Sequence, residues 1–315
     1  MSQPVSPPVH CVGCDVGKAE IVVFDQSTGK TTTLANQPAA LADFAASLDP
    51  NCLVVCEATG GYEAALLSAL SAAGRAAHRA DARKVKAYIR SFGTLGKTDR
   101  LDAQALARYG AERHQGLARW NPPEAAQSRL QALVLLRRDL VADRTAWNNR
   151  RKAPSAHHAQ DVHALMIATL DAQIGAVEGQ IKATIDTCSP LKQNEKTLRR
   201  IAGVGPAVSG GLIALMPELG TLDRREVASL AGVAPHPQQS GQSNGYRATK
   251  GGRPEVRRLL FMAALAASRS KSELAEFYKR LVANGKKPIV ALTALMRKII
   301  VIANAKIRDQ RLQLS

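Results

Sequence analysis

A pair of prolines, Pro122-Pro123, divides the sequence into two parts of different periodicity. Before the prolines, short apolar and β-branched runs alternate with turns and helical patterns. After them, residues 124–152 and 158–187 lack strand alternation and glycine turns, and carry Leu, Ile and Val every three to five residues. Apolar residues at this spacing predict helices. The sequence therefore predicts an α/β part followed by a mostly helical part, without an internal repeat.

The first part opens with two apolar runs around the turn Val16-Gly17-Lys18-Ala19, which is typical of a hairpin. Strands are expected at residues 10–15, 20–25, 31–34, 52–56 and 75–79, and helices at 39–48, 62–73 and 99–114. Strands that alternate with helices after an opening hairpin predict a mixed sheet with helices on its faces.

The second part begins with two long helices joined near Ala153-Pro154-Ser155. Such a pair forms an antiparallel hairpin, which suits a spacer or an oligomerisation arm; the alternative is two ordinary helices packed on a domain. From about Glu195 the pattern stays helical except at residues 235–252, which are rich in Gly, Ser, Gln and Asn. We therefore expect three domains, at residues 1–120, 121–190 and 191–315.

Charge is distributed unevenly along the 315 residues, whose net charge is +17. Residues 1–120 have a net charge of +2 and residues 121–315 a net charge of +15, and residues 240–315 hold 16 basic and 4 acidic side chains. This excess indicates a polyanionic partner bound mainly by the second part. Aromatic residues make up only 4% of the chain, which argues against binding nucleic acid by base stacking.

Several observations concern location and cysteine chemistry. The apolar runs 289–296 and 299–303 are short and are separated by Arg297 and Lys298, so no membrane span is expected. The first nine residues do not resemble a signal peptide, and five cysteines fit a reducing cytoplasm. The pairs Cys11/Cys14 and Cys52/Cys56 suggest a zinc site or, as the favoured interpretation, buried apolar thiols.

Four carboxylates of the first part fall at the ends of predicted elements. Asp15 ends the first strand, Glu57 follows the strand at 52–56, and Asp99 and Asp102 share one face at a helix start. If the two strands are neighbours, the carboxylates meet at one edge of the sheet and suit Mg²⁺ or Mn²⁺. Paired divalent ions support phosphodiester displacement. Taken singly, each acid is common at such positions, and Asp99 could simply cap its helix.

The local motifs around these acids resemble a known family. Gly13-Cys14-Asp15-Val16-Gly17-Lys18, Glu57-Ala58-Thr59-Gly60-Gly61-Tyr62 and Lys97-Thr98-Asp99-Arg100-Leu101-Asp102-Ala103 resemble motifs of the DEDD transposases of bacterial insertion sequences, named after insertion sequence one-hundred-ten. Cys14 replaces the family's usual apolar residue. The resemblance implies a RuvC-like, RNase H type fold, and gives the metal-ligand and catalytic roles to Asp15, Glu57, Asp99 and Asp102.

The second part carries two further motifs. Residues 201–207, with Gly203 and Gly205, look like a helix-hairpin-helix turn whose amides can hold a phosphate. Leu230-Ala231-Gly232-Val233-Ala234-Pro235, Ser240-Gly241 and Lys250-Gly251-Gly252 resemble the family's transposase domain. From the residues alone Ser240, Ser243 and Thr249 are all candidate nucleophiles, and the resemblance implies Ser240.

Basic residues close to these motifs are the predicted nucleic-acid contacts. A phosphate beside Ser240 would be neutralised by the cations that follow it, and the turn at 284–287 resembles the family's N-G-K-K motif. With the two glycines of the turn at 201–207, the predicted contacts are Lys18, Lys97, Gly203, Gly205, Arg247, Lys250, Arg253, Arg257, Arg258, Lys286 and Lys287.

The sequence thus predicts a transposase or recombinase that cuts and rejoins donor and target DNA through a phosphoserine link. The resemblance implies a guide RNA encoded by the element and a homo-oligomer, a dimer or tetramer with composite active sites. A metal-only nuclease of RuvC type and a non-enzymatic DNA or RNA binder remain as alternatives. A DNA invertase acting on fixed sites also remains possible within the family.

Overall fold

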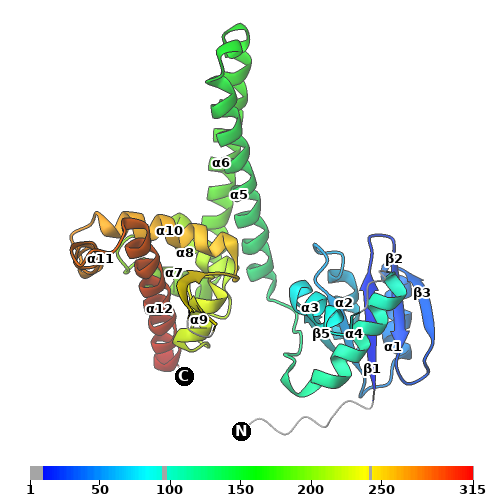
Figure 1. The fold of residues 1–315 in the computed structure, drawn as a ribbon. Coiled ribbons are helices and arrows are strands. Elements are labelled where there is room, and N and C mark those ends of the chain that lie inside the picture. Colours follow the sequence, from blue (N-terminus) through cyan, green and yellow to red (C-terminus); the bar gives the residue numbers. More distant parts are fainter. Residues whose placement is uncertain (1–9, 94–97, 241–242, 315) are drawn as a thin grey trace. The chain divides into compact units, whose positions relative to one another are not determined.

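The computed structural model describes residues 10–93, 98–240 and 243–314, and their contacts divide the chain into two compact units, Met1–Pro123 and Glu124–Ser315 (Figure 1). Each unit has its own hydrophobic core. The helical hairpin belongs to the second unit.

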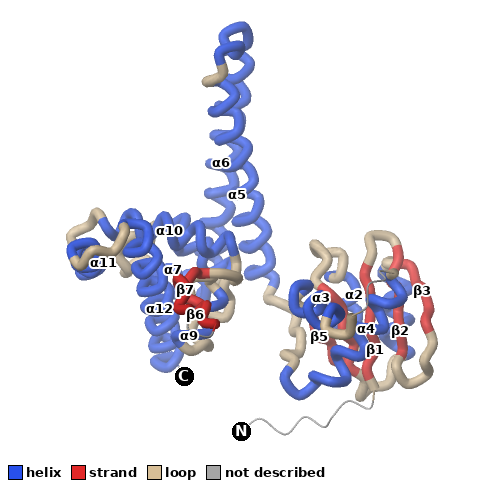
Figure 2. Tube along the Cα trace, viewed as in Figure 1, coloured by secondary structure: helices blue, strands red, loops and turns tan. Residues whose placement is uncertain are grey.

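A five-stranded mixed sheet forms the centre of the first unit, in the order β3-β2-β1-β4-β5 (Figure 2). The strands β1, β2 and β3 form an antiparallel meander, and β1, β4 and β5 are parallel. Their bounds are β1 Cys11–Val16, β2 Glu20–Asp25, β3 Thr31–Ala35, β4 Leu53–Glu57 and β5 Ala76–Ala80. The helices are α1 Pro38–Ser47, α2 Ala64–Ala72, α3 Ala82–Arg90 and α4 Asp99–Arg113, which continues into the 3₁₀ turn η1 His114–Gly116.

The two faces of this sheet are buried in separate clusters because side chains alternate along each strand. Val12, Cys14 and Cys56 pack in the cluster that includes apolar residues of α1 and α2. Cys11, Leu53 and Val55 pack on the other face with apolar residues of α3 and α4. Both central strands are therefore covered on both sides, which explains why β1 and β4 are almost continuously apolar.

The second unit is mostly helical. Its helices are α5 Ala125–Arg151, α6 Gln160–Thr187, α7 Ser189–Leu198, α8 Pro206–Leu215, α9 Arg224–Leu230, α10 Pro254–Ser268, α11 Glu273–Ala283 and α12 Pro288–Leu314. The 3₁₀ turn η2 Pro154–Ala159 joins α5 to α6, and these two helices extend side by side beyond the rest of the unit (Figure 1). The strands β6 Pro235–Ser240 and β7 Ser243–Thr249 form an antiparallel hairpin.

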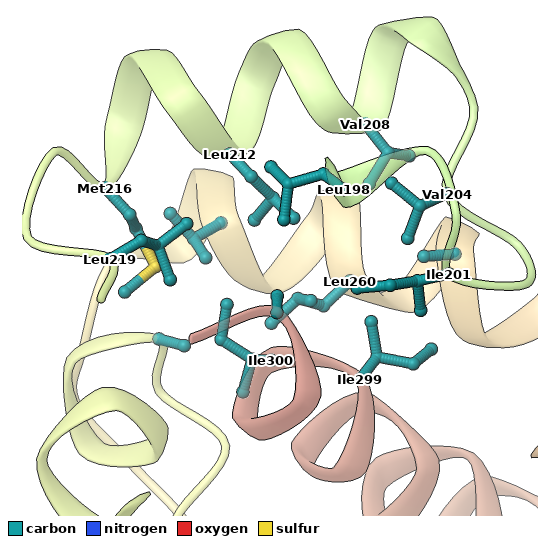
Figure 3. Packing of buried hydrophobic residues seen from close by; sticks show 14 of the residues in the cluster. Leu198, Ile201, Val204, Val208, Leu212, Met216, Leu219, Leu260, Ile299 and Ile300 are labelled. Carbon is teal, nitrogen blue, oxygen red and sulfur yellow. The ribbon is translucent and has the colours of Figure 1, made fainter. Parts of the chain in front are cut away.

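One core holds the helices of the second unit together. Figure 3 shows side chains from α7, α8, α10 and α12, among them Leu198, Leu212, Leu260 and Ile299, packed against one another. All four of these side chains are completely buried. By length and composition α12 could cross a membrane, but seven of its apolar side chains lie in this core, which accounts for its apolar character.

Most expected elements are confirmed within one or two residues at each end. The mixed α/β class of the first unit and the helical character of the second are also confirmed. The helix α3 was not predicted. The polar stretch at 235–252 is non-helical as expected, and its residues 235–240 and 243–249 pair as antiparallel strands, which were not predicted.

The four cysteines of the sheet are buried thiols, as favoured from the sequence. Burial raises the pKa of Cys56 to about 12 and that of Cys52 to about 11, and raises the pKa of Cys14 well above its ordinary value. Cys11 packs on the α3/α4 face of the sheet and the other three thiols pack on the α1/α2 face, so the four sulfur atoms do not converge on one zinc ion.

Candidate active site

Asp15 and Glu57 lie at the same level on adjacent strands. The parallel register of β1 and β4 pairs Cys14 with Cys56, so the next residue of each strand is an acid at the carboxyl end of the sheet. Cys14 and Cys56 face the α1/α2 side, and alternation places Asp15 and Glu57 on the opposite side, which α4 covers. The sequence predicted this pairing on the condition that the strands are neighbours, and the sheet meets that condition.

The helix α4 brings the other two acids towards the same edge. Its sheet-facing stripe includes Ala103, Leu106, Ala107 and Gly110, all buried. Asp99 and Asp102 stand four residues before Ala103 and Leu106, so they continue that stripe by one helical turn. Thr98 caps the helix by accepting a hydrogen bond from the Leu101 amide, with an N···O distance of 3.2 Å. The helix cap is therefore provided without the Asp99 side chain.

Gly13 sets how closely α4 packs on β1. A Cβ atom at Gly13 would overlap the carbonyl oxygen of Ala103 and lie 2.5 Å from the amide nitrogen of Ala107. At the other end of the contact, a Cβ at Gly110 would lie 2.7 Å from Val55. Because Ala103 lies against Gly13 while Gly110 lies against Cys11 and Val55, α4 runs antiparallel to β1. Its first turn therefore lies at the strand end that carries Asp15.

The four acids offer only carboxylate oxygens, which is the donor chemistry that Mg²⁺ and Mn²⁺ prefer. Asp15, Glu57 and Asp102 are partly exposed and Asp99 is exposed. Across the described ranges, no three Asp, Glu, His or Cys side chains come close enough together to hold a metal ion as they stand. The acids therefore fit such an ion by chemistry and by their position at one edge, and their carboxylates would have to close on it.

A fifth acid, Glu63, organises the loop that follows Glu57. Its carboxylate is 2% exposed and accepts hydrogen bonds from the amides of Thr59 and Gly61, at 3.1 and 3.0 Å. Arg79 of β5 donates its Nε–H to the same carboxylate at 2.7 Å. Burial alone would raise the pKa of Glu63, but the hydrogen bonds and the charge of Arg79 outweigh it and hold this pKa below its ordinary value. Glu63 therefore acts as a support of the loop, with its charge neutralised by Arg79.

Asn36 joins the turn after Asp15 to the same loop. Its side-chain amide donates to the carbonyl oxygens of Gly17 and Tyr62, at 3.0 and 3.2 Å. The two loops that flank the acidic edge are thus tied to each other. Sequence reasoning missed Asn36 and Glu63, because neither belongs to a recognisable pattern before its partners are known. Lys18 is exposed in the turn after β1, and Lys97 lies outside the described residues.

Ser240 is the last residue of β6, and its register partner on β7 is Ser243. The predicted nucleophile, Ser240, therefore lies at the last residue pair of the antiparallel β6–β7 pairing. Two crossing loops clamp the base of this hairpin, since a Cβ at Gly252 would overlap the backbone of Gly232. The positive φ angles of Gly232 and Gly252, 71° and 66°, favour glycine as well.

Two of the predicted phosphate contacts help to build this clamp. The Arg257 guanidinium donates to the carbonyl oxygens of Gly232, at 3.0 Å, and Gly251. The two terminal guanidinium nitrogens of Arg253 donate to the Glu218 carboxylate at 2.8 and 2.6 Å. Burial would raise the pKa of Glu218, but Arg253 outweighs it and lowers this pKa. Arg253 and Arg257 therefore have protein partners, whereas Lys250, Arg258, Lys286 and Lys287 are exposed. The side chain of Arg247 is not among those that the structure describes.

The turn between α7 and α8 lines an open cavity of about 620 Å³. Gly203 has a φ of 84°, and a Cβ there would overlap the carbonyl oxygen of Ala263 on α10. Gly203 thus allows the turn to pack on α10, while Gly205 precedes α8 with open space around it. Arg199 and Arg200 line the same cavity, which gives it a basic rim.

Comparison with known proteins places both units in one group. Residues 12–153 match a family described as transposases, and residues 195–279 match a family described as transposases of the IS116/IS110/IS902 family. The pilin gene-inverting proteins of Moraxella lacunata and Moraxella bovis are each 31% identical over 238 residues, which cover 72% of this chain and 71% of each relative. A protein of insertion element IS116 from Streptomyces clavuligerus is 26% identical over 215 residues, covering 60% of this chain and 53% of that protein.

Proposed function

This chain belongs to the IS110 family of transposases, and from that membership we propose that its acidic sheet edge and Ser240 cut and rejoin DNA through a covalent phosphoserine intermediate. Transposase or recombinase activity follows from the family itself. The observation that carries the finer proposal is the register of β1 and β4, which sets Asp15 level with Glu57 beside the first turn of α4.

In this proposal the first unit is a RuvC-like domain of RNase H type. The order β3-β2-β1-β4-β5, with an antiparallel meander followed by parallel strands, supports it. Asp15, Glu57, Asp99 and Asp102 would hold one or two Mg²⁺ or Mn²⁺ ions. Bound there, such ions would neutralise the charge that develops on the phosphate and the leaving oxygen. The Glu63–Arg79 pair and Asn36 would keep the loops around the acids in place.

Ser240 would act as the nucleophile. Its hydroxyl oxygen attacks the phosphorus of a DNA phosphodiester and forms an ester bond, while the bond from phosphorus to the sugar oxygen breaks. The serine loses its proton, and the departing sugar oxygen gains one. A hydroxyl group of a second DNA strand then attacks the phosphoserine and reverses the exchange, so the number of phosphodiester bonds is conserved. The clamp at Gly232 and Gly252 supports this role, because it fixes the base of the hairpin that carries Ser240.

We further propose that the active site is composite, with acids and serine from different protomers, and that α5 and α6 serve as the oligomerisation arm. Exposed apolar side chains on the hairpin, including Leu136, Val162 and Leu165, support this role. A guide RNA that pairs with donor and target DNA completes the proposal. The low aromatic content and the basic second unit are compatible with holding duplexes by their backbones.

Inversion of a DNA segment between fixed sites is a second candidate. It is favoured by the similarity to two proteins named as pilin gene-inverting proteins, each matched over 71% of its length. Cleavage and rejoining would use the same residues, and only the arrangement of the sites in the DNA would differ.

A covalent trapping experiment tests the proposed chemistry. The full-length chain is incubated with the DNA that flanks its gene, Mg²⁺ and RNA co-purified from the host, and the products are run on a denaturing protein gel. We expect a labelled protein–DNA adduct with the wild-type chain and with Ser243→Ala, and none with Ser240→Ala. Strand cleavage by Ser240→Ala at the wild-type rate would show instead that a water molecule is the nucleophile.

A further inference from the structure

The first unit carries a basic helix face that its near-neutral total charge conceals. Eight of its 13 Lys and Arg residues, but only two acidic ones, lie between residues 75 and 100. Four of the eight are on α3, namely Arg83, Lys84, Lys86 and Arg90, and all four are exposed. The averaged charge of the domain therefore gives a misleading picture of this surface.

The opposite side of α3 is firmly anchored. Val85 is completely buried and Tyr88 is 7% exposed, and the Tyr88 ring meets the ring of Tyr109 on α4 edge-on at 5.2 Å. Asp81 caps the helix by accepting from the amides of Arg83 and Lys84. The cations thus project from a helix that is capped at its start and packs beside α4.

Most of these cations have no acidic partner. Within the described ranges, Lys84, Lys86 and Arg90 form no ion pair, and Arg83 lies 3.7 Å from Asp81. Other exposed cations of the chain are paired along or between helices, as in Arg108–Glu112, Lys182–Asp186 and Arg144–Asp171. Like charges three and four residues apart, as at 83, 86 and 90, destabilise a helix. If this face served only to keep the protein soluble, acidic residues among the cations would make the helix more stable.

The position of α3 relative to the acidic edge suggests what binds it. The register of β4 and β5 pairs Glu57 with Ala80, so β5 ends level with Glu57 and α3 begins two residues later. The first turn of α3 therefore lies at the sheet edge that carries the acids. Four carboxylates repel a phosphate backbone, and neighbouring cations offset that repulsion. At 1.5 Å per residue, the nine residues of α3 span about 14 Å, the rise of about four phosphates along one DNA strand.

We propose that the exposed face of α3 binds the sugar–phosphate backbone of the DNA strand that enters the acidic site. Arg83, Lys86 and Arg90, which are three and four residues apart and so share one side of the helix, are the contacts. This inference rests on the proposed function, because it takes the acidic edge as the place where DNA is cut. It adds a DNA-binding surface to the unit that contributes little net charge.

Salt-dependent binding tests the surface directly. The variant Arg83→Gln/Lys86→Gln/Arg90→Gln keeps helix-forming side chains of similar length and removes three charges. The matched control, Arg129→Gln/Arg151→Gln/Lys152→Gln, removes three exposed charges from α5 and its end. Affinities for a labelled DNA duplex and for an RNA duplex of the same sequence are measured at increasing salt in EDTA with each protein. The far-UV circular dichroism spectra are compared to establish folding.

The α3 variant should bind at low salt at least about tenfold more weakly, and its plot of log affinity against log salt should be shallower by about 2.7, since each phosphate contact contributes about 0.9. The control should keep the wild-type slope. An unchanged slope for the α3 variant, an equal loss in both variants, or a loss confined to RNA duplexes would overturn the proposal. Because the assay contains no Mg²⁺, a failure of the cleavage chemistry would show only in the covalent trapping experiment.

Discussion

At the scale of single residues, the supports of the acidic edge are better defined than its candidate ligands. Glu63 is buried and satisfied by two amides and Arg79, while Asp15, Glu57, Asp99 and Asp102 are more exposed. Partial exposure of this kind leaves the candidate ligands accessible to a cation, whereas the buried Glu63 serves to hold the loop.

Glu63→Gln should destabilise the first unit by about 2 kcal/mol, because it weakens charge-assisted hydrogen bonds in a buried position. The pKa of Glu63 is lower in the folded protein than in the unfolded chain, so its contribution is complete above about pH 4.3 and is lost as the pH falls through the folded pKa. Urea unfolding in a Trp147→Phe background, with Trp120 on the sheet core as reporter, measures the loss.

The control for that experiment is Glu20→Gln, which changes an exposed carboxylate of the same unit. The difference in free energy of unfolding between wild type and Glu63→Gln should become smaller below about pH 4.3. The free energy of unfolding of Glu20→Gln should equal that of the wild type at every pH. A Glu63→Gln protein as stable as wild type at pH 7 would remove the loop-supporting role.

At the scale of elements, Gly232, Gly251 and Gly252 belong to sequence motifs shared with the family, and two of them let the loops at the base of the β6–β7 hairpin cross closely. Gly252→Ala places a Cβ into the backbone of Gly232, whereas a Cβ at Gly251 meets nothing within 4 Å. Both residues have positive φ angles, 66° and 73°, so both variants carry a similar strain of about 1 kcal/mol. Only Gly252→Ala should separate the two loops of the clamp.

We therefore expect Gly252→Ala to lose covalent adduct formation and to be cut by proteases within residues 235–252. Gly251→Ala should retain most of its adduct formation and most of its resistance to proteases. Limited proteolysis followed by the adduct gel measures the two effects. Equal behaviour of the two variants would mean that strain at the glycines matters rather than the crossing of the loops.

The elements also show which patterns a sequence reveals. The strands β1 and β4 were predictable because their apolar runs are short and end at acids, and α5 and α6 because their apolar spacing persists for many turns. The helix α3 was missed because four of its nine residues are cationic and its buried side rests on Val85, Tyr88 and Ile89 alone. The hairpin at 235–249 was missed because its residues are polar and its pairing depends on glycines elsewhere.

The same limit applied to the site. The four acids and Ser240 could be named from spacing and motif, but the roles of Gly13, Glu63 and Arg257 required their partners in space. Arg253 and Arg257 illustrate the point most clearly, since a basic cluster in sequence indicates phosphate binding until Glu218 and the carbonyl of Gly232 are seen beside them.

At the scale of the whole molecule, the chain combines an α/β unit with acids at one sheet edge and a larger helical unit that holds most of the net positive charge. The basic face of α3 modifies that division, because cations also accompany the acids. A chain that both binds and breaks a polyanion needs cations at the point of cleavage as well as along the duplex.

The most direct measurement of the central claim is to identify the residue that carries DNA after covalent trapping. The adduct is digested with nuclease and trypsin, and the peptide of residues 226–247 is sequenced by mass spectrometry. The account predicts a nucleotide on Ser240 in the wild-type protein and no modified peptide from Asp15→Asn. A nucleotide on Ser243 or on any residue outside this peptide, or an adduct that forms equally well in Asp15→Asn, would contradict it.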